Sequence, residues 1–234
     1  MALIKTPEEI IIMKRAAEAT QSVFARILGS EFIRTGATER LIADKMEAFA
    51  MDIPGVSELS FPTIVASGPN GAQPHAEISD RILESGDFVT IDFGVTIDGY
   101  TSDMTRTFIL GKPTSKQRKI YRSVQRSQAA GVAAAKAGIA CAELDEICRG
   151  LIREDGYGDY FIHTTGHGVG TEVHEDPRIG AKSKAILEAG MVVTIEPGIY
   201  IEGFGGVRIE DTVLITEAGC EVITPLISKD LIIL

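Results

Sequence analysis

Two acidic residues of this sequence lie where apolar side chains are expected. Asp92 interrupts the apolar run of GDFVTIDFGVTIDGY, residues 86–100, and Glu196 interrupts GMVVTIEPGIYIEGF, residues 190–204. Both stretches are rich in β-branched residues, as strands are. Burying a carboxylate is unfavourable unless a cation or hydrogen-bond donors compensate its charge. A matched acid in two matched strands therefore indicates that these carboxylates serve a chemical purpose.

Each of these strands leads to a second acid. The Asp-Gly pair at 98–99 is a preferred two-residue hairpin loop. In such a hairpin Asp92 lies across from Thr105, and Asp103 is a diagonal neighbour of Asp92 on the same face, at about 7 Å. Glu196 and Glu210 flank a longer glycine-rich loop in a comparable way. Four ionised carboxylates brought together would repel one another, so a cationic group is expected between them.

The histidines point to the nature of that cation. Three of the four, His163, His167 and His174, lie in or just before TGHGVGTEVHEDP, and the fourth is His75. The spacing of His163 and His167 is by itself only a weak zinc signal. Together with the carboxylates, an imidazole completes an oxygen-rich ligand set that suits manganese, cobalt, iron or zinc better than a metal that prefers thiolates. We therefore predict a metal site.

An internal repeat must position these residues. Seven of fifteen positions are identical between residues 86–100 and 190–204. Two predicted helices, one long and one shorter, precede each copy. The long helices begin at Thr6 and Thr114, each an N-cap with a capping box, and the shorter helices are expected at roughly 38–51 and 142–154. The sequence thus predicts an α+β fold of two helix-helix-hairpin halves, about 1–111 and 112–234, related by a pseudo-twofold axis, with a curved antiparallel sheet flanked by four main helices.

Composition excludes several classes of function. The 234 residues are 44% hydrophobic, enough for one large domain with its own core. The 33 acidic and 23 basic residues give a net charge of −10, which argues against nucleic acids and anionic membranes as general partners. There is no C-x-x-C pair, no signal-peptide pattern and no apolar run near the ~20 residues of a membrane span. A cytoplasmic location is expected.

Five segments resemble, in order, the motifs of the pita-bread metallopeptidases, the superfamily of methionine aminopeptidase, prolidase, Xaa-Pro aminopeptidase and creatinase. They are PHAEISDRILESGDFVTIDFG, DGYTSDMTRTF, TGHGVGTEVHEDP, TIEPGIYI and GGVRIED. The resemblance covers essentially the whole chain. It implies the pita-bread fold and a single catalytic domain over residues 1–234, without the additional N-terminal domain that proline-specific members commonly have.

The resemblance also implies a ligand set, carried over motif by motif. Asp92, Asp103, His167, Glu196 and Glu210 match the five ligands of a two-metal site, with Asp92 on one metal, His167 and Glu196 on the other, and Asp103 and Glu210 bridging. The cofactors implied are two divalent ions, manganese or cobalt before zinc or iron. Such a pair clamps a hydroxide and polarises the scissile carbonyl. Glu196 is implied as the proton shuttle to the leaving nitrogen.

The same motifs imply the substrate contacts. His75 and His174 are expected to contact the substrate or the tetrahedral intermediate, and His163 to line the proline side of the cleft. Arg208 resembles the family arginine that neutralises and orients the ligand carboxylates. Tyr200 is expected to support the site.

The proline-specific branch is favoured by PHA, HEDP and EPGIYI. The expected activity is therefore that of an exopeptidase that hydrolyses the Xaa-Pro bond, either at the N-termini of peptides, as an aminopeptidase, or in dipeptides, as a dipeptidase. The choice between these two stays open. Methionine aminopeptidase is the alternative enzyme, and a non-catalytic pita-bread binding module is the alternative of another class. Peptides are the expected partners, and a homodimer is a candidate assembly.

Overall fold

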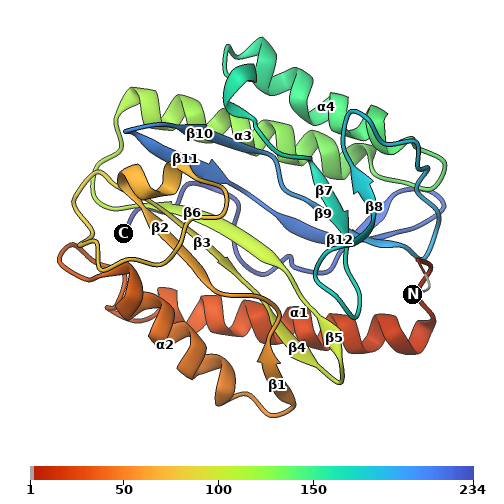
Figure 1. The fold of residues 1–234 in the computed structure, drawn as a ribbon, viewed down its shortest axis with the longest axis horizontal. Coiled ribbons are helices and arrows are strands. Elements are labelled where there is room, and N and C mark those ends of the chain that lie inside the picture. Colours follow the sequence, from red (N-terminus) through yellow and green to blue (C-terminus); the bar gives the residue numbers. More distant parts are fainter. Residues whose placement is uncertain (1–2) are drawn as a thin grey trace.

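The computed structural model describes residues 3–234 (Figure 1). Its two longest helices begin at matching N-terminal caps. The Thr6 hydroxyl accepts from the backbone N–H of Glu9, and the Glu9 carboxylate accepts from the N–H of Thr6. Thr114 and Gln117 form the second such capping box. Both boxes were predicted, and each satisfies two backbone donors that the helix itself leaves without a partner.

The elements alternate between helices and antiparallel strands. The helices are α1 (Pro7–Leu28), α2 (Glu39–Met51), α3 (Ser115–Ala134) and α4 (Cys141–Glu154), with the short 3-10 helices η1 (Gly68–Ala72) and η2 (Gly158–Tyr160). The strands of residues 3–111, here called the first half, are β1 (Val56–Leu59), β2 (Ile64–Ser67), β3 (Phe88–Phe93), β4 (Val95–Ile97), β5 (Tyr100–Thr101) and β6 (Met104–Ile109). Those of residues 112–234, the second half, are β7 (Gly166–Gly168), β8 (Glu175–Ile179), β9 (Val192–Ile195), β10 (Gly198–Ile201), β11 (Gly205–Arg208), β12 (Asp211–Ile215) and β13 (Cys220–Val222).

The strands lie between the two pairs of helices. In Figure 1, α3 and α4 lie above the strands and α1 and α2 below them. The strand orders are β1-β4-β5 and β2-β3-β6 in the first half, and β13-β12-β9-β7-β8 and β10-β11 in the second. The named ladders are antiparallel, which confirms the predicted α+β class.

The first hairpin has the predicted register but is broken where one continuous pair of strands was expected. Asp92 pairs with Thr105, and Asp98 and Gly99 form the loop with φ values of 49° and 80°. Each arm is divided, so that β3 pairs with β6 and β4 with β5. The break falls at Gly94, where any Cβ would overlap the carbonyl of Ser102. Only glycine allows the two arms to approach so closely.

The second hairpin follows the same plan. Ile195 pairs with Asp211 and Gly198 with Arg208, so Glu196 and Glu210 lie opposite one another between these pairs. This supplies the register that the longer loop left open in the sequence. It also fixes which residues of the two halves are equivalent.

Two large buried clusters divide along the repeat. One packs α1 and α2 on β3 and β6 around Phe24, Met46 and Phe93, and the other packs α3 and α4 on β9 and β12. A smaller cluster joins Met13 of α1 to Val192 and thus links the halves. Among residues 3–234, no helix is long and apolar enough to cross a membrane.

Candidate metal centre

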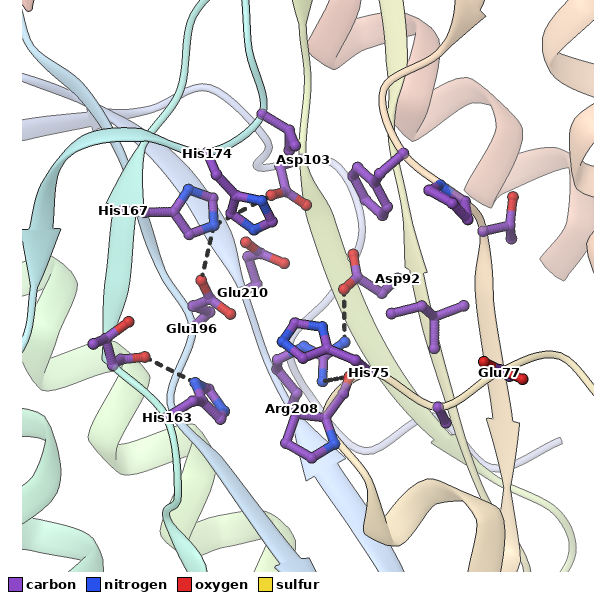
Figure 2. Close-up of a pocket in the computed structure, with 18 of the residues that line it drawn as sticks. His75, Glu77, Asp92, Asp103, His163, His167, His174, Glu196, Arg208 and Glu210 are labelled. Carbon is purple, nitrogen blue, oxygen red and sulfur yellow. Dashed lines mark hydrogen bonds and ion pairs between the residues drawn. The ribbon is translucent and has the colours of Figure 1, made fainter.

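A cleft of ≈ 430 Å³ is lined by residues of both halves (Figure 2). Every site residue predicted from the sequence lines it except Tyr200, which lies directly behind. The predicted carboxylate ligands lie where strands end or break, and His167 lies within β7. Asp92 is near the end of β3, Asp103 precedes β6, and Glu196 and Glu210 lie between successive strands of the second hairpin. Broken strands therefore let these carboxylates turn toward one point.

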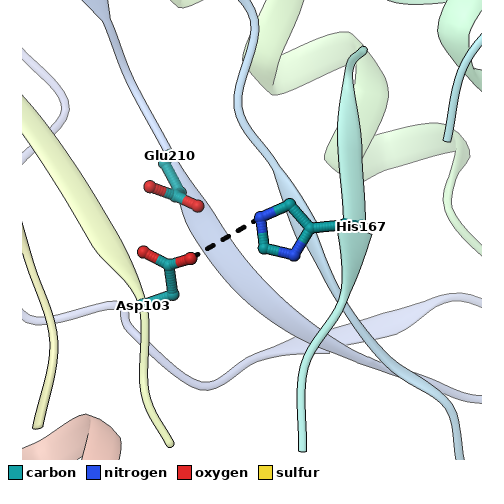
Figure 3. Close-up of side chains that lie close together, drawn as sticks. All are labelled: Asp103, His167 and Glu210. Atoms are coloured by element: carbon teal, nitrogen blue, oxygen red, sulfur yellow. Dashed lines mark ion pairs between the residues drawn. The ribbon is translucent and has the colours of Figure 1, made fainter. Parts of the chain in front are cut away.

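Three of the predicted ligands are close enough to share an ion. Asp103, His167 and Glu210 each offer one ligand atom, and these atoms lie within 4.8 Å of one another (Figure 3). His167 Nε2 lies 3.6 Å from Asp103 Oδ2 and 3.1 Å from Glu196 Oε1. Asp92 faces the same cleft from β3 (Figure 2).

The backbone around His167 is built for close approach. A Cβ at Gly166 would overlap the carbonyl of Thr194, and one at Gly168 would overlap that of Asp176. The two glycines thus allow β7 to sit tightly between its neighbours. The Nδ1 of His167 lies 3.0 Å from the carbonyl oxygen of Gly168, which can only accept, so Nδ1 carries the proton. Nε2 is left to face the carboxylates, the arrangement that metal-binding histidines require.

The buried carboxylates of the cluster repel one another. Burial, then repulsion by Glu210, Asp92 and Glu196, raises the pKa of Asp103 well above its usual range. Burial and the same neighbouring carboxylates likewise raise the pKa of Glu210. Burial, the largest single influence, would also raise the pKa of Glu196, but the hydrogen bond and positive charge of His167, together with the charges of His163 and Arg208, outweigh it and lower that pKa to about 2. A divalent ion would offset the repulsion directly.

Asp92 supplies a further sign that a cation fits. Its Oδ2 accepts from Arg208 Nη2 at 2.6 Å, whereas its buried Oδ1 has no hydrogen-bond partner among residues 3–234. An orphaned buried carboxylate oxygen is rare and calls for an ion or an ordered water. With an imidazole and several carboxylates around it, the donor set suits a hard or borderline divalent metal.

A chain of hydrogen bonds leads from Arg208 to His163. Arg208 Nη1 donates to Tyr200 Oη at 2.8 Å, and Tyr200 Oη lies 2.9 Å from His163 Nε2. The Nδ1 of His163 lies 2.8 Å from the carbonyl of Thr164 and must therefore donate. In the neutral ring Nε2 then accepts from the Tyr200 hydroxyl, and burial lowers the pKa of His163. Both ring nitrogens are occupied.

The other two histidines border the cleft. The side chains of His75 and His174 are exposed, and the His174 ring lies edge-on to that of His167 with 4.4 Å between centroids. Both line the cleft.

Two charged residues and an apolar wall of the cleft were not predicted. Arg178 and Glu77 line it, together with Phe61, Pro62, Ile64, Ile78 and Val173. Strand β8 alternates buried and exposed residues, with Glu175 facing inward and Arg178 exposed. That alternation places Asp176 and Arg178 on the exposed face but does not distinguish between them, and nothing in the sequence marks Glu77 as a cleft residue.

Comparisons with known proteins agree with this geometry. Residues 12–217 match the family described as metallopeptidase family M24. The Xaa-Pro dipeptidase of Pyrococcus furiosus is 51% identical over 225 residues, which are 96% of this chain and 64% of that protein. The structure of an Xaa-Pro dipeptidase from Bacillus anthracis has a TM-score of 0.96 at 48% identity, over 99% of this chain and 64% of that one.

A third relative extends the likeness beyond dipeptidases. The structure of an X-Pro aminopeptidase from Thermotoga maritima has a TM-score of 0.94 at 38% identity, over 99% of this chain and 65% of that one. The chain thus spans slightly less than two thirds of the length of these relatives. The pita-bread fold predicted from the sequence is confirmed, and the chain belongs to metallopeptidase family M24.

Proposed function

We propose that this chain carries the catalytic centre of a metal-dependent peptidase that hydrolyses the bond between a residue and a following proline. The observation that carries the proposal is the meeting of Asp103, His167 and Glu210 within 4.8 Å. This occurs in a cleft that His163 and His174 also line. The names of the relatives, Xaa-Pro dipeptidase and X-Pro aminopeptidase, support the proline branch, and methionine aminopeptidase is not favoured.

The residues that would hold the metal are Asp92, Asp103, His167, Glu196 and Glu210. Two divalent ions, manganese or cobalt in the first place, would activate a water molecule and polarise the scissile carbonyl. The presence of all five residues argues against a non-catalytic binding module. The Glu196 side chain is 15% exposed, so it can reach the cleft and move a proton to the leaving nitrogen.

His163 explains how the cleft would favour proline. Because both ring nitrogens are engaged, by Tyr200 and by the carbonyl of Thr164, the ring offers only carbon atoms to a substrate. A bond before proline is a tertiary amide without an N–H, so the site must recognise the pyrrolidine by shape. A carbon surface supplies that contact.

Arg178 favours a dipeptidase over an aminopeptidase. Its exposed guanidinium lines the cleft, and a free proline carboxylate is present in a dipeptide but absent beside the scissile bond of a longer peptide. Guanidinium and carboxylate form strong paired hydrogen bonds. We therefore assign Arg178 to the carboxylate of an Xaa-Pro dipeptide.

The activity is tested by kcat/KM for Ala-Pro, Ala-Ala and Met-Ala with manganese present. Packing a few ring carbons supplies only ~1–3 kcal/mol, so we expect Ala-Pro to exceed Ala-Ala by roughly 10- to 200-fold. A clear preference for Met-Ala would instead place the chain with the methionine aminopeptidases.

The preference for a dipeptide over a longer peptide is tested by comparing Ala-Pro with Ala-Pro-amide, which lacks the carboxylate. We expect the amide to be the poorer substrate, and Arg178→Ala to raise KM for Ala-Pro while leaving the amide unchanged. Arg118→Ala, an exposed arginine of α3 outside the cleft, is the control. Equal hydrolysis of the two substrates by the unmodified protein would favour an aminopeptidase.

A further inference from the structure

Thr105 lies where the two halves meet, and its hydroxyl contacts the other half twice. Its Oγ1 donates to Glu210 Oε2 at 2.6 Å and accepts from Arg208 Nε at 3.0 Å. The residue is fully buried. A guanidinium can only donate, so the hydroxyl accepts from Arg208 and directs its own proton to Glu210, which gives it a single orientation. Thr105 thereby joins Glu210 to Arg208.

The far end of Arg208 extends this connection to the first half. Its Nη2 donates to Asp92 Oδ2 at 2.6 Å, as Figure 2 shows. A continuous path therefore runs from Asp92 through Arg208 and Thr105 to Glu210. It links one candidate ligand from each half through hydrogen bonds of 3.0 Å or less.

The repeat gives Thr105 a particular place in this path. Positions 91 and 195 are equivalent in the repeat, and their strand partners are Arg106 and Asp211. Thr105 and Glu210 each lie one residue before these partners. They are thus equivalent positions of the two halves. Where the second half supplies a carboxylate, the first half supplies a hydroxyl that binds it.

We propose that Thr105 is a positioning residue of the metal centre. Its hydroxyl fixes the direction of the Glu210 carboxylate and ties it to the Arg208 that holds Asp92. This rests on the proposed function only in taking Asp92 and Glu210 as metal ligands. Partners that orient ligand side chains commonly change metal affinity by about 10- to 100-fold when they are removed.

Thr107 offers a matched control two residues further along β6. It is also buried, and its Oγ1 donates to the backbone carbonyl of Arg208 at 2.9 Å and accepts from the Arg208 N–H at 3.1 Å. It has the same side chain, on the same face of the same strand, and it makes a similar number of bonds to the other half. Its hydroxyl touches no candidate ligand carboxylate.

The experiment is a calorimetric titration of metal-free protein with manganese chloride, without substrate. We expect Thr105→Val to bind manganese about 10- to 100-fold more weakly. Thr105→Ser, which keeps the hydroxyl, and Thr107→Val should stay close to the unmodified protein. Thermal unfolding of the metal-free forms should show similar losses for the two valine variants, because both leave buried groups without partners.

Unchanged manganese affinity in Thr105→Val, or an equal loss in Thr107→Val, would overturn the proposal. If Thr105→Val does not fold, Thr105→Ala is titrated in its place with the same expectation. Because binding is measured without substrate, a failure to hydrolyse Ala-Pro with intact manganese binding would count against the proposed function and not against the role of Thr105.

Discussion

His174 combines exposure to the cleft with contact to a candidate ligand. Its ring lies edge-on to that of His167, yet the side chain has no hydrogen bond that would assign it to the fold among those described for residues 3–234. Burial lowers the pKa of His174, and His167 and Arg178 lower it further, so the neutral ring is favoured near neutral pH. A neutral imidazole at the rim can donate a hydrogen bond to an oxygen that develops charge.

Replacing His174 by alanine tests this assignment. We expect kcat for Ala-Pro to fall by about 100-fold or more, as when one transition-state donor is lost, while metal content stays nearly intact. Glu172→Ala, an exposed position of the same loop, is the control. Kinetics and metal analysis of the same samples decide the matter: unfolding, or loss of metal, would make His174 a structural residue.

At the scale of elements, the loop that carries His174 is held by a buried ion pair. Glu175, the first residue of β8, accepts from Lys5 Nζ at 2.7 Å and from the backbone N–H groups of Thr171 and Glu172. Burial would raise the pKa of Glu175, but the bonds from Lys5 and from the loop outweigh it, and the pKa is lowered. The N-terminal segment thus anchors one wall of the cleft.

Glu175→Gln should therefore lower the melting temperature in a pH-dependent way. A carboxylate whose pKa is depressed in the folded state contributes stability above its unfolded pKa of about 4.3, and this contribution is lost as pH falls through the lower folded value. The difference in melting temperature between the two proteins should be constant above about pH 5.5 and shrink below about pH 4. Calorimetric scans from pH 3 to 7 check this, and a difference that grows on acidification would contradict it.

Local patterns predicted the elements that carry the site, because their causes lie within a few residues. The Asp98-Gly99 turn set the pairing of Asp92 with Thr105, and threonine caps set the starts of α1 and α3. The break at Gly94 depends on a close approach of two arms that no local pattern records. The bond between Thr105 and Glu210 joins residues 105 positions apart, so it follows only from how the two halves face one another.

At the scale of the whole molecule, both halves contribute to one charged centre, and its occupancy should govern stability. Ions that bind only the folded state stabilise it. We expect two divalent ions per chain at full loading, a lower melting temperature in chelator, and recovery of stability and hydrolysis with manganese or cobalt. Elemental analysis and calorimetry check the expectation, and undiminished turnover after verified metal removal would contradict it.

Asp103→Asn provides the control for that experiment. It removes charge from the centre without removing the side chain, and the pKa of Asp103 is already raised by burial and by its acidic neighbours. The metal-free variant should be at least as stable as the metal-free parent, and manganese should raise its melting temperature less. An equal manganese effect in both proteins would place the stabilising ion elsewhere.

The strand register bears on the symmetry of the chain. Arg106 and Asp211 are equivalent positions of the repeat, and Arg106 Nη2 donates to Asp211 Oδ1 at 2.7 Å in the buried interior. Two identical halves would have set arginine against arginine there, or aspartate against aspartate, and buried like charges repel. Unlike residues can occupy the two places only when the two halves are encoded separately and can mutate independently. A dimer of two identical half-chains could therefore not contain this ion pair at its centre.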